Sequence, residues 1–179
     1  MIKFNKVKES IENFDTRCHF LVRVLKSSQD FSKYSDSEII DEIIKSKFHH
    51  WRGEEEPNGL SISLSINNKN KTLENYKFYG FFDNDKLSSS NYKKVAFEDF
   101  RKMIMTSISE FTDGDSSFEL KVQNIIIELN SRSIFYHLDL SVGINPDLVA
   151  EWTTYSLFTA FISIDRKNSS AALIEFGQD

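Results

Sequence analysis

The sequence predicts an α+β fold in which a mainly antiparallel sheet of about six strands is covered on one face by about four helices. Several segments place apolar residues at every second position, which is typical of strands. Most of these segments are joined by loops of hairpin length rather than by helical crossovers, which favours antiparallel pairing. Because 179 residues suit one core, we expect residues 1–179 to form a single domain.

The segment 116–143 is predicted to supply the two central strands. Apolar side chains alternate over residues 118–122, shift by one position at Asn124, and alternate again over residues 125–129. An inserted residue exchanges the two faces of a strand, so this pattern predicts one long strand with a bulge. After a polar break, alternation resumes over residues 134–142 and predicts an antiparallel partner.

Helices are predicted in four places. Residues 4–26 carry apolar side chains at spacings of three and four, which predicts one long amphipathic helix or two helices broken near Asp15. Ser35 and Glu38 have the spacing of a capping box, and the helix that they open is expected to end near residues 50–53. The other two helices are expected at 97–111, which Gly114 follows, and, as a short helix, after Asn145-Pro146-Asp147.

The remaining strands are predicted from alternation and turn residues. Leucine or isoleucine alternates with serine over residues 60–66, after a turn-rich linker at 54–59. An aromatic strand is expected at 76–82, followed by a polar loop at 83–94. From about residue 155 the pattern predicts a C-terminal hairpin whose turn spans residues 166–170.

The composition indicates a compartment and excludes some classes of protein. Cys18 is the only cysteine, so an intramolecular disulfide cannot form. The sequence contains no apolar run of about 20 residues and no signal-peptide pattern at the start, so we expect a cytoplasmic protein that does not bind membranes. A net charge of −5 argues against direct binding of nucleic acid through phosphate contacts.

The negative charge is concentrated in two segments. Residues 36–56 contain seven acidic and three basic side chains, and residues 110–119 contain four acidic side chains and no basic one. Such patches attract basic surfaces and speed association with them. A solvated acidic face that binds nothing is the alternative interpretation.

Candidate catalytic and metal-binding groups are few. His49 and His50 precede Glu54, Glu55 and Glu56, a set of side chains that can ligate zinc or transfer protons. Adjacent residues on a helix point in different directions, so we favour histidines at a helix end followed by an acidic loop.

Two further chemistries are disfavoured by the pattern. Cys18 could act as a nucleophile with His19 or His137 as its base, but it is predicted to lie on a buried stripe. The acidic residues at 83–85 and 113–115 fail the calcium-loop spacing, and nucleotide-binding and hydrolase motifs are absent from the sequence. We therefore expect no catalytic residues, no bound metal and no cofactor, and a protein that is not an enzyme.

The acidic segments 36–56 and 110–119, in a small α+β chain without catalytic motifs, resemble bacterial immunity proteins of contact-dependent growth inhibition systems. The resemblance implies a protein that binds and neutralises a cognate toxin, with a nuclease as the favoured class because nuclease active sites are basic. The residues expected to contact the toxin are Glu54, Glu55 and Glu56 with Asp36, Asp41 and Glu42, or alternatively Asp113 and Asp115. Trp51 is the expected aromatic anchor.

Two other functions stay open from the sequence. One is a small enzyme without a short motif that uses His49, His50 or His137 with a nearby carboxylate. The other is a ligand-binding or scaffolding module that forms a homodimer through the first helix or through a sheet edge. A concave pocket around a histidine would favour the enzyme, and a dimeric chain would favour the module.

Overall fold

A computed structural model describes residues 1–14, 18–49, 60–66, 69–76, 78–79, 82–112, 115–129, 132–139 and 157–178. Its centre is a six-stranded sheet in the order β1-β2-β10-β9-β8-β7, and all neighbouring strands pair antiparallel. The strands are β1 (Phe4–Asn13), β2 (Cys18–Ser27), β7 (Tyr92–Val95), β8 (Ile134–Leu138), β9 (Leu157–Asp165) and β10 (Ser170–Gln178). The predicted α+β class and antiparallel sheet are confirmed.

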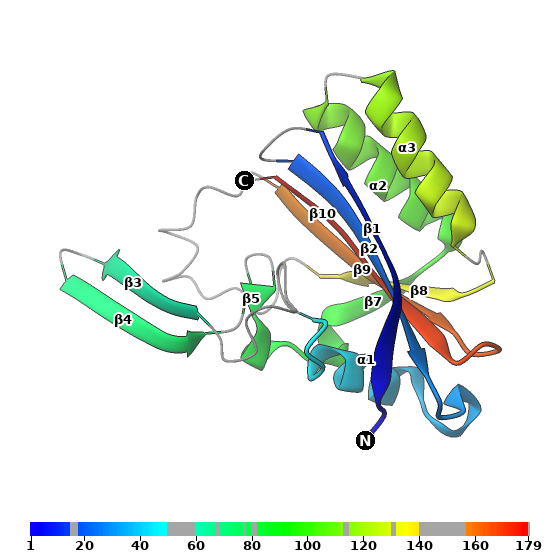
Figure 1. Ribbon diagram of the computed structural model, residues 1–179, viewed down its shortest axis with the longest axis horizontal. Helices are drawn as coiled ribbons and strands as arrows, with labels where there is room; N and C mark the ends of the chain where they lie inside the picture. The colour runs from blue at the N-terminus through cyan, green and yellow to red at the C-terminus, as the bar shows by residue number, and fades with distance from the viewer. Residues whose placement is uncertain are drawn as a thin grey trace.

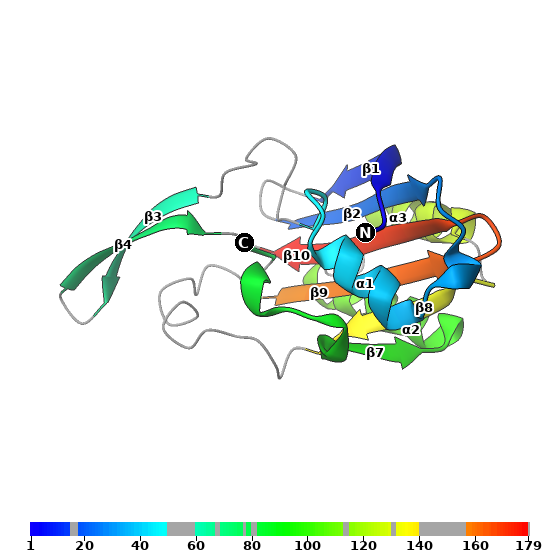
Figure 2. The ribbon, with the colours of Figure 1, turned by 90° about the horizontal axis from the view of Figure 1, so that it is seen from below.

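Three α-helices lie within the described residues, and they cover both faces of the sheet rather than one. They are α1 (Asp36–Ile44), α2 (Phe97–Phe111) and α3 (Ser116–Glu128). Helix α1 covers one face, and α2 and α3 lie together on the other (Figure 1, Figure 2). The expectation of helices on one face was wrong, because β2, β9 and β10 bury side chains on both faces of the sheet. Burial on both faces is common in parallel sheets, and it occurs here in an antiparallel one.

The predicted helix at 4–26 is instead the hairpin of β1 and β2. Leu25 faces the α1 side, whereas Phe20 and Val22 face the α2–α3 side, so both faces of β2 are buried. A strand buried on both faces loses its simple alternation. A bulge between Lys6 and Lys8 shifts the alternation of β1 as well. Together these two effects produced the helix-like spacing.

The predicted long strand at 118–129 is helix α3. Asp115 caps the helix, because its Oδ1 accepts hydrogen bonds from the backbone N–H groups of Ser117 at 2.8 Å and Phe118 at 3.0 Å. Phe118, Val122 and Ile126 repeat every four residues and form the buried stripe. Strand β8 therefore pairs with β7 and β9 and not with the segment before it.

Several predicted elements are confirmed. The capping box of Ser35 and Glu38 opens α1, although the helix ends at Ile44 and not near residue 50. Helix α2 has the predicted bounds, and the hairpin of β9 and β10 turns at residues 166–169. The short helix predicted after residue 145 lies outside the described residues.

Outside the main sheet, the middle of the chain forms short elements. Strand β3 (Leu60–Ile66) is as predicted and pairs with β4 (Lys69–Tyr76). In place of one strand at 76–82 there are two strands of two residues each, β5 (Phe78–Tyr79) and β6 (Phe82–Asp83). Short 3-10 helices occupy Phe31–Lys33, Asn84–Lys86 and Ser89–Asn91. Among the described helices, none has the length and apolar character needed to cross a membrane.

Candidate functional site

Asp36, at the start of α1, forms hydrogen bonds with two side chains from other parts of the chain. Its Oδ1 accepts a hydrogen bond from Nε of Arg166 at 3.0 Å, and its Oδ2 accepts one from the Tyr136 hydroxyl. Arg166 also donates to the backbone oxygens of Phe31 at 2.6 Å and Tyr34 at 2.9 Å. Burial, followed by the hydrogen bond to Asp36, raises the pKa of Tyr136 well above its ordinary value. This network joins α1 to β8 and to the β9–β10 turn.

The other two acidic residues predicted on α1 also hold neighbouring segments. The Oδ1 of Asp41 accepts a hydrogen bond from the backbone N–H of Ser89 at 2.6 Å. Glu42 accepts one from the backbone N–H of Ile2 at 3.0 Å through its Oε2. These contacts give both carboxylates a structural role. That they also contact a partner stays a prediction.

The remaining predicted contact residues divide into two groups. Asp115 is exposed and caps α3, so its Oδ1 is already engaged by backbone N–H groups. The others, Trp51, Glu54, Glu55, Glu56 and Asp113, lie outside the described residues.

Two of the candidate reactive groups are buried. Cys18 lies in the core between the sheet and the α2–α3 pair, on a strand rather than on a helix. The His49 ring is fully buried, with Nδ1 2.6 Å from Oδ1 of Asn84 and Nε2 2.8 Å from the Tyr92 hydroxyl. His49 is thus part of a structural hydrogen-bond chain. Within the described ranges, no three metal-ligating side chains group together.

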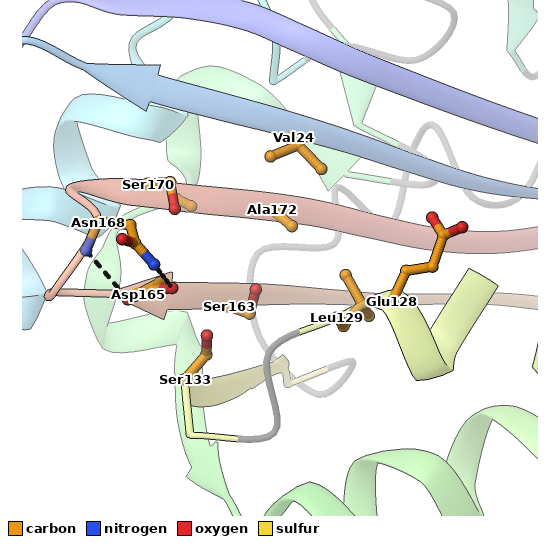
Figure 3. Close-up of a pocket in the computed structure, with 10 residues that line it drawn as sticks. Val24, Glu128, Leu129, Ser133, Ser163, Asp165, Asn168, Ser170 and Ala172 are labelled. Carbon is orange, nitrogen blue, oxygen red and sulfur yellow. Dashed lines mark hydrogen bonds between the residues drawn. The ribbon is translucent and has the colours of Figure 1, made fainter. Parts of the chain in front are cut away.

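A polar cavity of about 410 Å³ opens where α3 ends over the sheet (Figure 3). Its floor comes from β2, β9 and β10, and its walls come from the last residues of α3 and from the β9–β10 turn. The lining residues are Val24, Glu128, Leu129, Ser133, Ser163, Asp165, Asn168, Ser170, Ala171 and Ala172. The cavity is not filled because the side chains that line it are small or polar and none is aromatic.

The cavity is rich in hydrogen-bond acceptors. Ser163 is only 5% exposed and lines the cavity from β9. Asp165 accepts hydrogen bonds from the backbone N–H and the side-chain amide of Asn168 at 3.2 and 2.8 Å. Glu128 forms an exposed ion pair with Lys8. Two carboxylates and three serine hydroxyls suit a ligand with several N–H or O–H donors.

A larger groove of about 640 Å³ lies beside α2. One face of α2 lines it with Asp99, Lys102, Met103, Thr106 and Ser107, and β7, β8 and β9 contribute Val95, His137 and Thr159. The groove is a concave site with a histidine at its floor, which is the feature that the enzyme hypothesis requires.

The His137 ring is held by two neighbours. Its Nε2 lies 3.3 Å from Oγ1 of Thr159, and its ring centroid lies 4.7 Å from that of Phe161. Burial lowers the pKa of His137 below its ordinary value, although Asp139 acts in the opposite direction, so the ring is neutral at pH 7. A neutral imidazole can both donate and accept a hydrogen bond.

Both cavities were missed by the sequence reasoning. Their lining residues come from four or five elements, and only the strand register brings them together. A weak signal existed in Ser163 and Ser170, which are polar residues within otherwise apolar strands. No family model, no curated protein and no solved structure matches this chain.

Proposed function

We propose that this chain is a cytoplasmic immunity protein that binds and neutralises a bacterial protein toxin, with a nuclease as the favoured class. The observation that supports this proposal best is the cavity at the end of α3, whose ionisable lining residues, Glu128 and Asp165, are both acidic. A nuclease active site is basic because it holds phosphates, so a fixed acidic surface attracts it and competes with its substrate.

The rigid framework supports the same proposal. Asp36, Asp41 and Glu42 are fixed by hydrogen bonds to distant segments, so these contacts hold the α1 surface in place before a partner binds. Preorganised surfaces lose less entropy when they bind. Glu54, Glu55 and Glu56 add a run of negative charge to the same segment of sequence.

The direct test is protection from a toxin. The probe is a bacterial nuclease toxin domain encoded beside a gene for this chain, where such a domain is found, expressed from an inducible promoter with and without this chain. We expect this chain to restore growth, and the purified pair to bind with a dissociation constant that rises with salt. Growth arrest in the presence of folded, abundant chain, with no binding at low salt, would overturn the proposal for that toxin.

The contact surface is tested by charge reversal. Replacing Glu54, Glu55 and Glu56 with lysine should weaken binding at least about tenfold, because like charges then face the basic toxin. A second variant replaces Glu98, Glu110 and Glu119 of α2 and α3 with lysine, changes the net charge by the same amount, and tests the acidic segment 110–119 in the same way. If both triple variants bind as the wild type does, neither patch is the contact surface.

The groove beside α2 favours a second candidate function, a small enzyme or ligand-binding module that uses His137 with Asp99. The specific observation is that a neutral, half-buried imidazole and a carboxylate line one concave space. A fragment screen by ligand-observed NMR tests it. Fragments that bind the wild type and are lost in His137→Ala support the candidate, and fragments that bind both equally reject it.

A further inference from the structure

The exposed large apolar side chains of the described residues gather along one edge of the molecule. Apart from Met1, they are Val7, Ile11, Phe14, Leu120 and Ile127, with exposed fractions between 36% and 73%. Val7 and Ile11 belong to β1, Phe14 follows it, and the other two lie on α3. Exposed apolar groups concentrated at one place indicate an interaction surface.

β1 forms this edge of the sheet. It is ten residues long, lies at the edge of the sheet (Figure 2) and pairs only with β2 among the described strands. Its outer backbone N–H and C=O groups therefore have no neighbouring strand in the described sheet. The bulge between Lys6 and Lys8 leaves residues 8–13 as a regular stretch that pairs with β2 without interruption. A regular edge of this length can add a further strand.

The charges of this stretch are self-complementary. Lys8 lies in its first half and Glu12 in its second, and both project to the face that carries α3, because both form ion pairs with α3. If two copies of β1 pair antiparallel about a two-fold axis at Ser10, Lys8 of each copy lies opposite Glu12 of the other. Opposite charges in facing positions stabilise an antiparallel pair.

The neighbouring registers are less favourable. Residues that face each other across strands must share a face of the sheet, so the axis can move only to another residue of the same strand. An axis at Glu9 places the two Glu9 carboxylates opposite each other. An axis at Ile11 places Glu12 opposite Ser10 and leaves Lys8 without an acidic partner on the other strand. The charge pattern therefore selects Ser10.

The two ion pairs of helix α3 are centred at the same level as this axis. Lys8 pairs with Glu128, and Glu12 pairs with Lys121 at 3.5 Å, so α3 runs antiparallel to β1 along the edge. The midpoint between Lys121 and Glu128 is thus level with Ser10. The exposed Leu120 and Ile127 lie on either side of this midpoint. Ile127 lies nearer to this midpoint than Leu120, and a two-fold axis at Ser10 places Leu120 of one copy on the same side of the axis as Ile127 of the other.

We propose that a second copy of this chain binds at this edge, and that the two copies form a two-fold symmetric dimer through antiparallel pairing of their β1 strands, centred on Ser10. The two sheets become one continuous sheet, and the two α3 helices lie side by side above the junction. The interface is isologous, as a two-fold dimer requires. This inference does not rest on the proposed immunity function, although Glu128 both lines the acidic cavity and pairs with Lys8 at this edge.

Charge reversal with mixing is the first test. Lys8→Glu places glutamates opposite glutamates, and Glu12→Lys places lysines opposite lysines, so each variant alone should have a dimer dissociation constant at least about tenfold above that of the wild type. In an equal mixture, every facing pair is again one lysine and one glutamate. Sedimentation equilibrium should show a heterodimer within about threefold of wild-type affinity.

Controls separate this effect from losses within one copy. Glu128→Gln breaks the ion pair of Lys8 within the chain but leaves the cross-strand pairs intact, so it should remain dimeric. Lys94→Glu changes the same charge on β7, the opposite edge, and should also remain dimeric. Thermal melts confirm that each variant is folded.

Cross-linking tests the register. Facing residues in an antiparallel pair have Cα atoms about 4.5–5.5 Å apart, which a disulfide can span. Ser10→Cys should therefore form a covalent dimer under mild oxidation, whereas Asn13→Cys should not. The proposal would be overturned by any of three results. The wild-type chain could be monomeric at about 100 μM, the two charge variants could fail to associate when mixed, or the two cysteine variants could cross-link equally.

Discussion

The two edges of the sheet differ in length, charge and apolar exposure. β7 has four residues, of which Lys93 and Lys94 are exposed, and Lys93 forms an ion pair with Asp139 at 2.5 Å. β1 has ten residues, carries both signs of charge, and exposes Val7 and Ile11. Short edges with lysines resist the addition of another strand. A long edge with charges of both signs can instead pair with a strand of complementary charge pattern. The β1 edge therefore favours the addition of a strand, and the β7 edge disfavours it.

The side chains that attach each edge to the sheet also differ. On the β1 side, Arg23 donates a hydrogen bond to Glu9 of β1 at 2.8 Å and to Glu175 of β10 at 3.2 Å. On the β7 side, Tyr92 reaches the buried ring of His49 at 2.8 Å. The buried contact at the β1 side is thus charged and the buried contact at the β7 side is neutral, whereas the Lys93–Asp139 ion pair of β7 has an exposed lysine. The following predictions test this difference.

Arg23→Ala is expected to have the largest effect. The Arg23 side chain is almost fully buried between β1 and β10, and Glu175 is fully buried. Removing the guanidinium leaves the Glu175 carboxylate buried without its cation, which should lower the free energy of unfolding by about 3–5 kcal/mol. Urea unfolding measures it. A loss below about 1 kcal/mol would mean that the ion cluster does not hold β1.

Tyr92→Phe should have a smaller effect at the other edge. The variant keeps the ring but removes the hydroxyl that meets Nε2 of His49, so a buried polar atom loses its partner. The expected loss of stability is about 1–3 kcal/mol. Tyr34→Phe is the control, because the Tyr34 hydroxyl is partly exposed and accepts a hydrogen bond from Gln29 at 3.3 Å. Equal losses of stability in both variants would show that the hydrogen bond to His49 contributes no more than the partly exposed hydrogen bond of Tyr34.

The two edges should respond to acid in different pH ranges. His137, on the strand next to β7, has a lowered pKa, mainly through burial, so the unfolded chain binds a proton more readily than the folded chain. Its contribution to stability is present above the ordinary value of 6.5 and is lost as the pH falls below it. His137→Gln should therefore flatten the stability profile between about pH 7 and pH 5.

At the β1 edge the loss comes at lower pH. Burial raises the pKa of Glu9, but hydrogen bonds from Arg23 and Lys6 outweigh it and leave the pKa below the ordinary 4.5. The stability from Glu9 is present above that value and is lost as the pH falls through the folded pKa. Glu9→Gln should flatten the profile only below about pH 4.5. A change near pH 6 in this variant would contradict the assignment.

Elements with a local signal could be predicted from the sequence. The capping box of α1, the amphipathic face of α2 and the turn between β9 and β10 each depend on residues close in sequence. The segments at 4–26 and 118–129 were assigned wrongly, because their apolar residues are so frequent that both periods fit them. At residues 18–27 a tertiary contact decided the outcome, because β2 pairs with β10, which lies more than 140 residues further along the chain. At residues 116–128 the deciding signal was local: Asp115 caps α3, and the strand prediction did not use that cap.

The candidate sites were less predictable than the fold. The carboxylates predicted on α1 are where the sequence placed them, but their partners, such as Arg166 for Asp36, lie far along the chain. The edge position of β1 and the agreement of α3 with its charges depend on sheet order, which the sequence does not encode locally. The suggestion of a sheet-edge homodimer could be made from the sequence, but its residues could not.

Hydrogen exchange of the two edge strands tests the central difference most directly. Backbone amides that face outward from β1 should exchange more slowly as the protein concentration rises, because pairing with a second β1 covers them. Outward amides of β7 should exchange at the same rate at every concentration. Exchange in β1 that is as independent of concentration as exchange in β7 would show that both edges are closed and would contradict the account.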